Sequence, residues 1–66
     1  MDKDEIGKKI RFLRTQKKLM QYELAEKAGV SALTIVRIEN GQVEPLKVTL
    51  KCIARALKVS LDELVG

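Results

Sequence analysis

The side chains of this chain that could do chemistry are cations and hydrogen-bond donors, because the usual nucleophiles and metal ligands are almost absent. The 66 residues include no His and a single Cys, Cys52. A zinc site needs several such ligands, and a His-based general base needs at least one His. We therefore expect no enzyme, no metal site and no cofactor. The net charge of +4 instead favours an anionic partner.

Aromatic side chains are also scarce, since Phe12 and Tyr22 are the only ones. Binding of RNA or single strands uses aromatic rings as stacking platforms, so the composition argues against those ligands. One unpaired Cys fits a reducing compartment, and no apolar run approaches the roughly 20 residues of a membrane span. The charged N-terminal segment MDKDEIGKK has no apolar signal region. We expect a single cytoplasmic domain over residues 1–66, with no membrane partner.

Two short helices joined by a tight turn are predicted between Gln21 and Gly41. Gly29 can supply the positive φ that ends the first helix, and Ser31 is placed as the N-cap of the second. The inward positions are small or apolar, as a close and steep helix crossing requires. These positions are Leu24, Ala25, Ala28, Ile35 and Ile38. The joint spacing of caps and apolar positions indicates a helix-turn-helix.

Three further helices complete an all-α prediction. A first helix is expected over about residues 4–17, on the apolar stripe of Ile6, Ile10 and Leu13. A fourth is expected over about residues 47–57, after Pro45. Its inward stripe is Leu50, Ile53, Ala54 and Leu57, with Leu46 on the same face. A short fifth helix follows Ser60, which forms a capping box with Glu63.

Four stretches together resemble the Cro/phage-repressor-type helix-turn-helix family, also called the XRE family. They are IGKKIRFLR (6–14), QYELAEKAGVS (21–31), IENG (38–41) and TLKCIARALKVSLDEL (49–64). The resemblance implies a compact five-helix lambda-repressor-like domain with its motif at 21–41. It implies a sequence-specific regulator of transcription, such as a repressor, that binds double-stranded DNA. We expect a homodimer on an inverted repeat, with half-sites about 34–36 Å apart.

The second helix of the motif, about residues 32–40, is the expected recognition helix. On a helical wheel Ile35 and Ile38 point inward, with Ala32 and Glu39 near that side. The candidate DNA contacts on this helix are Ala32, Leu33, Thr34, Val36, Arg37 and Asn40. Arg37 points outward and could bond guanine O6 and N7 bidentately, or it could contact a phosphate or solvent.

Backbone phosphates are the expected targets of a second group of side chains. By the resemblance, Gln21 at the first helix start and Asn40 at the second helix end contact phosphates. Ser31 is positioned at the groove, so we expect it to contact a phosphate in addition to capping its helix. Tyr22 and Lys47 are placed to reach phosphates as well. Glu44 is acidic where the family is often basic or neutral, so it should weaken binding or disfavour a close phosphate.

The apolar side chains of the recognition helix depart from the family, whose members commonly carry polar residues there. Ala32, Leu33 and Val36 could contact thymine methyl groups. Alternatively, specificity is low and phosphate contacts dominate. A third possibility is that this face binds a protein partner, as in an antitoxin- or coactivator-like interaction module.

Several other residues carry structural expectations. The resemblance pairs Arg14 of the first helix with Glu39, and a buried carboxylate needs such a partner. Met20 occupies a cap position where the family has Ser or Thr, so the next helix should start more weakly. A dimer surface is expected around Leu61, Leu64 and Val65, and Val48 with a partly exposed Cys52 could extend it.

Overall fold

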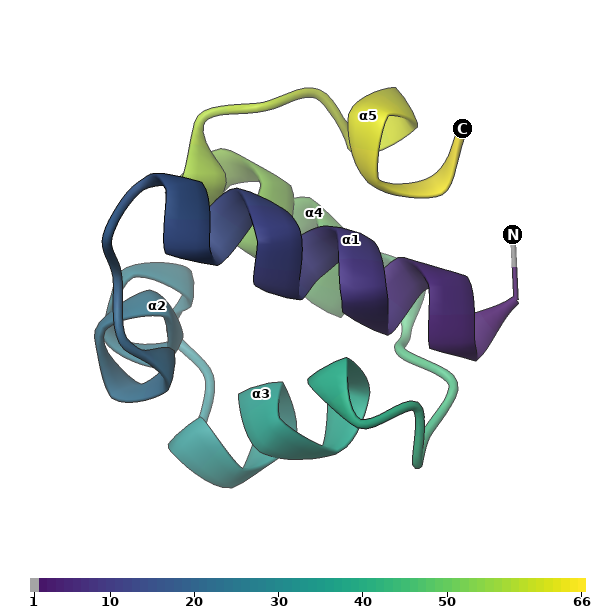
Figure 1. Ribbon diagram of the computed structural model, residues 1–66, viewed down its shortest axis with the longest axis horizontal. Coiled ribbons are helices and arrows are strands. Elements are labelled where there is room, and N and C mark those ends of the chain that lie inside the picture. The colour runs from purple at the N-terminus through teal and green to yellow at the C-terminus, as the bar shows by residue number, and fades with distance from the viewer. Residues whose placement is uncertain (1) are drawn as a thin grey trace.

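The computed structural model describes residues 2–66, and five α-helices account for most of them (Figure 1). They are α1 (Lys3–Gln16), α2 (Gln21–Ala28), α3 (Ala32–Glu39), α4 (Lys47–Leu57) and α5 (Leu61–Val65). The all-α prediction is confirmed, and each predicted helix is present. None of the helices within residues 2–66 combines the length and the apolar character needed to cross a bilayer.

The helices close into a ring around one core. In Figure 1, α1 crosses the molecule, α5 lies above it, and α2 and α3 lie below. Each helix packs against at least two others: α1 on α3 and α5, α2 on α3 and α4, and α4 on α5. Because every element has two packing partners, even the short α3 and α5 are fixed by tertiary contacts rather than by their own helix propensity.

The core is made of apolar side chains from all five helices. Its members are Ile6, Ile10, Leu24, Ala25, Ala28, Ile35, Ile38, Leu50, Ile53, Ala54, Leu57 and Leu64. The inward positions predicted for the helix pair and for α4 are therefore confirmed, and Leu13 is half-buried. The prediction for Leu46 was wrong, since its exposed fraction is 70%. Leu46 is the extended N-cap of α4 rather than part of the helix, so it does not follow the helical wheel.

The predicted caps at Ser31 and Ser60 are confirmed. Ser31 Oγ accepts from the Thr34 N–H at 3.1 Å, and Ser60 Oγ accepts from the Glu63 N–H at 3.2 Å. Met20 makes no side-chain cap, as was expected for a residue that replaces the Ser or Thr of the family. The Glu23 carboxylate still accepts from the Met20 N–H at 2.8 Å, so half of a capping box remains at the start of α2.

Four helices end in the same left-handed turn. The residues with positive φ are Lys18, Gly29, Gly41 and Lys58, at 59°, 74°, 70° and 59°. In each case the following N–H returns to a carbonyl five residues earlier, as in Val59 to Ala54 at 3.0 Å. Gly29 and Gly41 were predicted as helix stops. The two lysines were not, because nothing in a Lys side chain indicates this conformation.

Gly7 brings α1 and α3 into close approach. A Cβ at this position would overlap the carbonyl oxygen of Ile38, and the carbonyl oxygen of Glu39 would be 2.9 Å away. Gly7 itself is buried in the middle of a helix, where Gly costs stability on propensity grounds. The close packing of α1 on the last turn of α3 explains why it is there.

The left-handed lysine at the end of α4 gives a test of this fold. Gly adopts positive φ without the penalty of about 1 kcal/mol or more that a side chain carries, so Lys58→Gly should raise the free energy of unfolding by roughly 0.5–1 kcal/mol. The same change at Lys51, exposed within α4, should lower it by about 1 kcal/mol. Urea unfolding measures both, and two shifts of the same sign would contradict the assigned turn.

Candidate nucleic-acid interface

A buried carboxylate connects the three N-terminal helices. The Glu39 side chain has no exposed area, and it ends α3. Its Oε2 accepts from Arg14 Nε at 2.6 Å, and its Oε1 accepts from Arg14 Nη2 at 3.1 Å and from Gln21 Nε2 at 3.0 Å. Each buried charge of this kind must be paired and hydrogen-bonded to be tolerated. The end of α3 is thereby tied to α1 and to the first residue of α2.

Arg14 extends the same network to the turn before α2. Its side chain is only 12% exposed, and its Nη1 donates to the Leu19 carbonyl oxygen at 2.7 Å. The guanidinium therefore joins α1, the α1–α2 turn and α3 at once. The family resemblance implied a pair between Arg14 and Glu39, and the structure brings the two side chains together.

Arg11 is a member of the network that the sequence analysis did not single out. Its Nε lies 3.5 Å from Glu39 Oε1, and its Nη2 donates to Asn40 Oδ1 at 3.0 Å. The Arg11 side chain is 50% exposed. A signal was available in the sequence: Arg11 precedes Arg14 by three residues, and residues three apart on a helix share a face.

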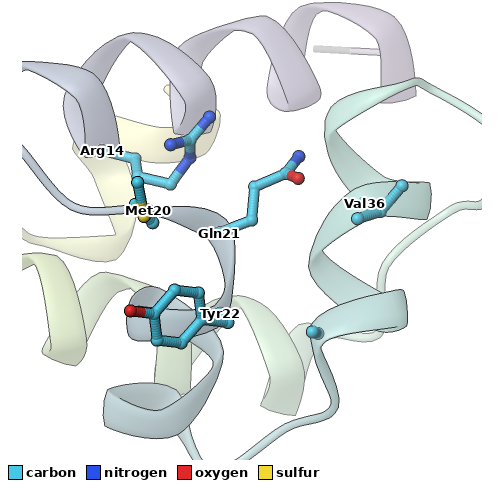
Figure 2. Close-up of a pocket in the computed structure, with 6 residues that line it drawn as sticks. Arg14, Met20, Gln21, Tyr22 and Val36 are labelled. Atoms are coloured by element: carbon cyan, nitrogen blue, oxygen red, sulfur yellow. The ribbon is translucent and has the colours of Figure 1, made fainter.

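An open groove of about 460 Å³ lies between the start of α2 and α3 (Figure 2). It is lined by Arg14, Met20, Gln21, Tyr22, Ala32 and Val36. Figure 2 shows the Gln21 side chain reaching from α2 towards α1 and α3, while the Tyr22 ring turns the other way. Three of the six lining side chains, Met20, Ala32 and Val36, are apolar, so the groove can accept an apolar group beside polar ones.

The outer face of α3 presents a stripe of exposed side chains, which we call the α3 stripe: Leu33, Arg37 and Asn40. Leu33 is 53% exposed, whereas Ile35 and Ile38 on the opposite side are buried. Thr34 and Val36 are half-buried on the flanks. The wheel orientation was thus right, except that Ala32 is exposed. It is the first residue of α3 and borders the open groove, so no neighbouring helix covers it.

Other predicted contact residues surround this stripe. The hydroxyl groups of Ser31 and Thr34 are hydrogen-bonded, with their oxygens 2.8 Å apart. Tyr22 is 57% exposed, and Lys47 is exposed at the start of α4. The structure brings Gln21 to Glu39 and Asn40 to Arg11, so two of the expected contact side chains are already held in place.

Comparison with known proteins assigns the family. Residues 10–64 match the helix-turn-helix family HTH_3. The chain belongs to this family.

The relatives of this chain include one regulator that is similar in sequence and two proteins of known structure. The transcriptional activator BcrR of Enterococcus faecalis is 41% identical over 62 residues, which cover 94% of this chain and 30% of BcrR. The restriction-modification controller protein C.AhdI of Aeromonas hydrophila superposes with a TM-score of 0.92 at 32% identity, covering 94% of each chain. The P22 c2 repressor, solved with the synthetic operator 9T, gives a TM-score of 0.83 at 34% identity and covers 89% of each chain.

These matches establish the five-helix, lambda-repressor-like fold of the helix-turn-helix family for this chain. The chain spans between about a third and about a half of the length of the first curated relatives it matches.

The surface predicted for a dimer needs correction at one residue. Leu64 is fully buried in the core beneath α5, so it is not available to a partner and the prediction was wrong there. It is buried because α5 is short and packs on both α1 and α4. Leu61, Val65 and Cys52 are half-buried, as was expected for Cys52, and Val48 is 64% exposed.

The carboxylate network predicts unequal effects of its two arginines. Arg14→Gln leaves Glu39 buried without its main charge partner and should cost about 3–5 kcal/mol, most of the stability of so small a domain. Arg11→Gln should cost less than about 1 kcal/mol, because its side chain is half exposed and its bond to Glu39 is long. Thermal unfolding followed by circular dichroism measures both. Equal losses for the two variants would contradict the network.

Proposed function

We propose that this chain is a sequence-specific regulator of transcription that binds double-stranded DNA through α3. The α3 stripe carries the proposal: one exposed apolar side chain, one exposed cation and one exposed amide lie along one face of a helix. An α-helix fits the major groove of B-DNA, where base edges present both hydrogen-bonding groups and thymine methyls. The buried residues of the opposite side, Ile35, Ile38 and Glu39, give the helix a fixed orientation before binding.

The start of α2 is the proposed main contact with the DNA backbone. Met20 makes no side-chain cap, so the first-turn amides of α2 have no side-chain acceptor from that position. Free amides and the positive end of the helix dipole together attract a phosphate. Gln21 gives one amide N–H to Glu39 and has a second one left for the phosphate. Tyr22, Ser31 and Lys47 are proposed as flanking phosphate contacts.

The relatives support this assignment at the level of the family. The P22 c2 repressor, at 34% identity, was solved bound to an operator. BcrR is named a transcriptional activator, so the family includes both directions of control. We propose that this chain controls transcription by occupying a DNA site, and that the same surface would bind DNA whether the outcome is activation or repression.

A homodimer on an inverted repeat is part of the proposal. The eight residues of α3 make a helix about 12 Å long, which covers about four base pairs of B-DNA. So short a site recurs often in any genome, and a two-fold pair of subunits doubles the sequence that is read. Leu61 and Val65, with Val48, are the proposed dimer contacts, and the half-sites would lie about 34–36 Å apart.

Arg37 is the proposed base-reading cation. Arg37→Ala should cost about 1–3 kcal/mol on a duplex selected for tight binding and should relax the base preference at one position. Arg55→Ala, which removes an exposed arginine from α4, serves as the matched control and should change neither the affinity nor the base preference. Fluorescence anisotropy on selected and unrelated duplexes measures the effect. An equal loss on both duplexes would make Arg37 a phosphate contact instead.

Leu33 is the proposed reader of thymine methyl groups. Replacing the contacted thymine by deoxyuridine removes one methyl, which should weaken binding of the unmodified protein about fourfold, from about 0.8 kcal/mol per buried methyl. For the variant Leu33→Ser the same replacement should have no effect. A loss that is equal in both proteins would contradict methyl contact by Leu33.

The protein-interaction alternative makes a different prediction for the same residue. If the apolar side chains around the groove bind a protein, Leu33→Lys should leave affinity for duplex DNA intact while partner binding is lost. On the DNA-reading proposal, Leu33→Lys should instead weaken discrimination between the selected and unrelated duplexes, because a cation replaces the methyl contact by a sequence-independent one.

A further inference from the structure

We propose that Arg11 binds a backbone phosphate at the C-terminal end of α3, together with Asn40, for which the family resemblance already implies a phosphate contact. This inference rests on the proposed DNA-binding function and assigns a contact on α1, outside the helix-turn-helix motif. Its ligand is a phosphodiester group of the duplex backbone, next to the groove that α3 enters.

Two arginines contact the single negative charge of Glu39, so one positive charge remains without an opposite charge. Glu39 carries one negative charge, and Arg14 lies against it at 2.6 Å with little exposure. Arg11 adds a second positive charge to the same carboxylate at the longer distance of 3.5 Å, with half of its side chain exposed. The cluster therefore carries a net positive charge at the surface, held in place by its neighbours. A fixed, partly exposed guanidinium is suited to binding an oxyanion.

The bond between Arg11 and Asn40 also fixes the Asn40 amide. Asn40 Oδ1 accepts from Arg11 Nη2 at 3.0 Å, so the Asn40 NH₂ group is turned away with both of its donors free of Arg11. The two N–H groups on Arg11 Nη1 remain free to donate, since the bonds to Glu39 and Asn40 use Nε and Nη2. The pair thus has free N–H donors on both side chains, and the oxygens of a phosphate can accept from them.

The position of the pair fits the backbone beside the groove. Asn40 follows Leu33 and Arg37 by seven and three residues, so it continues the α3 stripe to the end of the helix. Arg11 and Gln21 both donate to the same oxygen of Glu39. The proposed site therefore lies close to the phosphate site at the start of α2 and on the same surface as the α3 stripe.

A structural role for Arg11 has to be separated from phosphate binding, because the negative end of the α3 dipole also attracts a cation there. Salt dependence makes the distinction, since only a residue that neutralises a phosphate changes the slope of log affinity against log salt. The variants are Arg11→Gln, Asn40→Ala and the double variant, with Arg55→Gln as the control. Each is titrated with selected and unrelated duplexes between about 50 and 200 mM salt, and its melting temperature is recorded.

For Arg11→Gln we expect the salt slope to fall by about 0.9 and the affinity to drop about fivefold near 0.15 M salt, equally on both duplexes. Asn40→Ala should weaken binding without changing the slope. The double variant should lose less than the two single losses combined, because both side chains serve one phosphate. Arg55→Gln should leave the affinity and the slope unchanged.

An unchanged slope for Arg11→Gln would overturn the assignment and leave Arg11 a purely structural residue. Additive losses in the double variant would overturn the shared phosphate. If the unmodified protein shows no salt-dependent affinity for any duplex, the proposed function itself fails, and this site fails with it.

Discussion

The buried carboxylate of Glu39 is the interaction on which the rest of this structure depends. It is the last residue of α3, and it receives hydrogen bonds from Arg14 on α1 and from Gln21 on α2. A helix of eight residues is too short to be stable alone, so its orientation comes from such contacts. Because one end of α3 is held by this network and its inner side by Ile35 and Ile38, the outer face is presented rigidly to a ligand.

Close packing is the second condition for this arrangement. Gly7 lets α1 approach the last turn of α3, and Ala25 and Ala28 keep the inner side of α2 small. Larger side chains at these positions would separate the helices and lengthen the bonds to Glu39. The network and the small residues thus support each other. Buried ion pairs often add little net stability, and here the fixed geometry of α3 is the better reason for keeping one.

Much of the fold followed from the sequence because its signals are local. Gly29, Ser31 and Ser60 are residue types whose preferred conformations mark helix ends, and apolar periodicity marks buried faces. What depends on tertiary packing was harder to predict. Lys18 and Lys58 adopt left-handed turns that their side chains do not indicate. Leu46 was expected on the inward face of α4 and is exposed, whereas Leu64 was expected at a dimer surface and is buried. A helical wheel describes neither a residue outside the helix nor the docking of a five-residue helix.

Within the candidate site, the outward residues of α3 were predictable from spacing. The link from Arg11 to Asn40 was not, since it joins residues 29 positions apart.

We propose above all that the rigid outer face of α3 reads the sequence of double-stranded DNA. Selection of tight-binding duplexes from a random pool at near-physiological salt, followed by a salt titration on the selected duplex, tests it most directly. We predict an inverted repeat with half-sites about one helical turn apart, and an affinity for it well above that for unrelated duplexes at the same salt. Enrichment of no sequence, with affinity for every duplex falling equally as salt rises, would show only attraction to the backbone and would contradict the account.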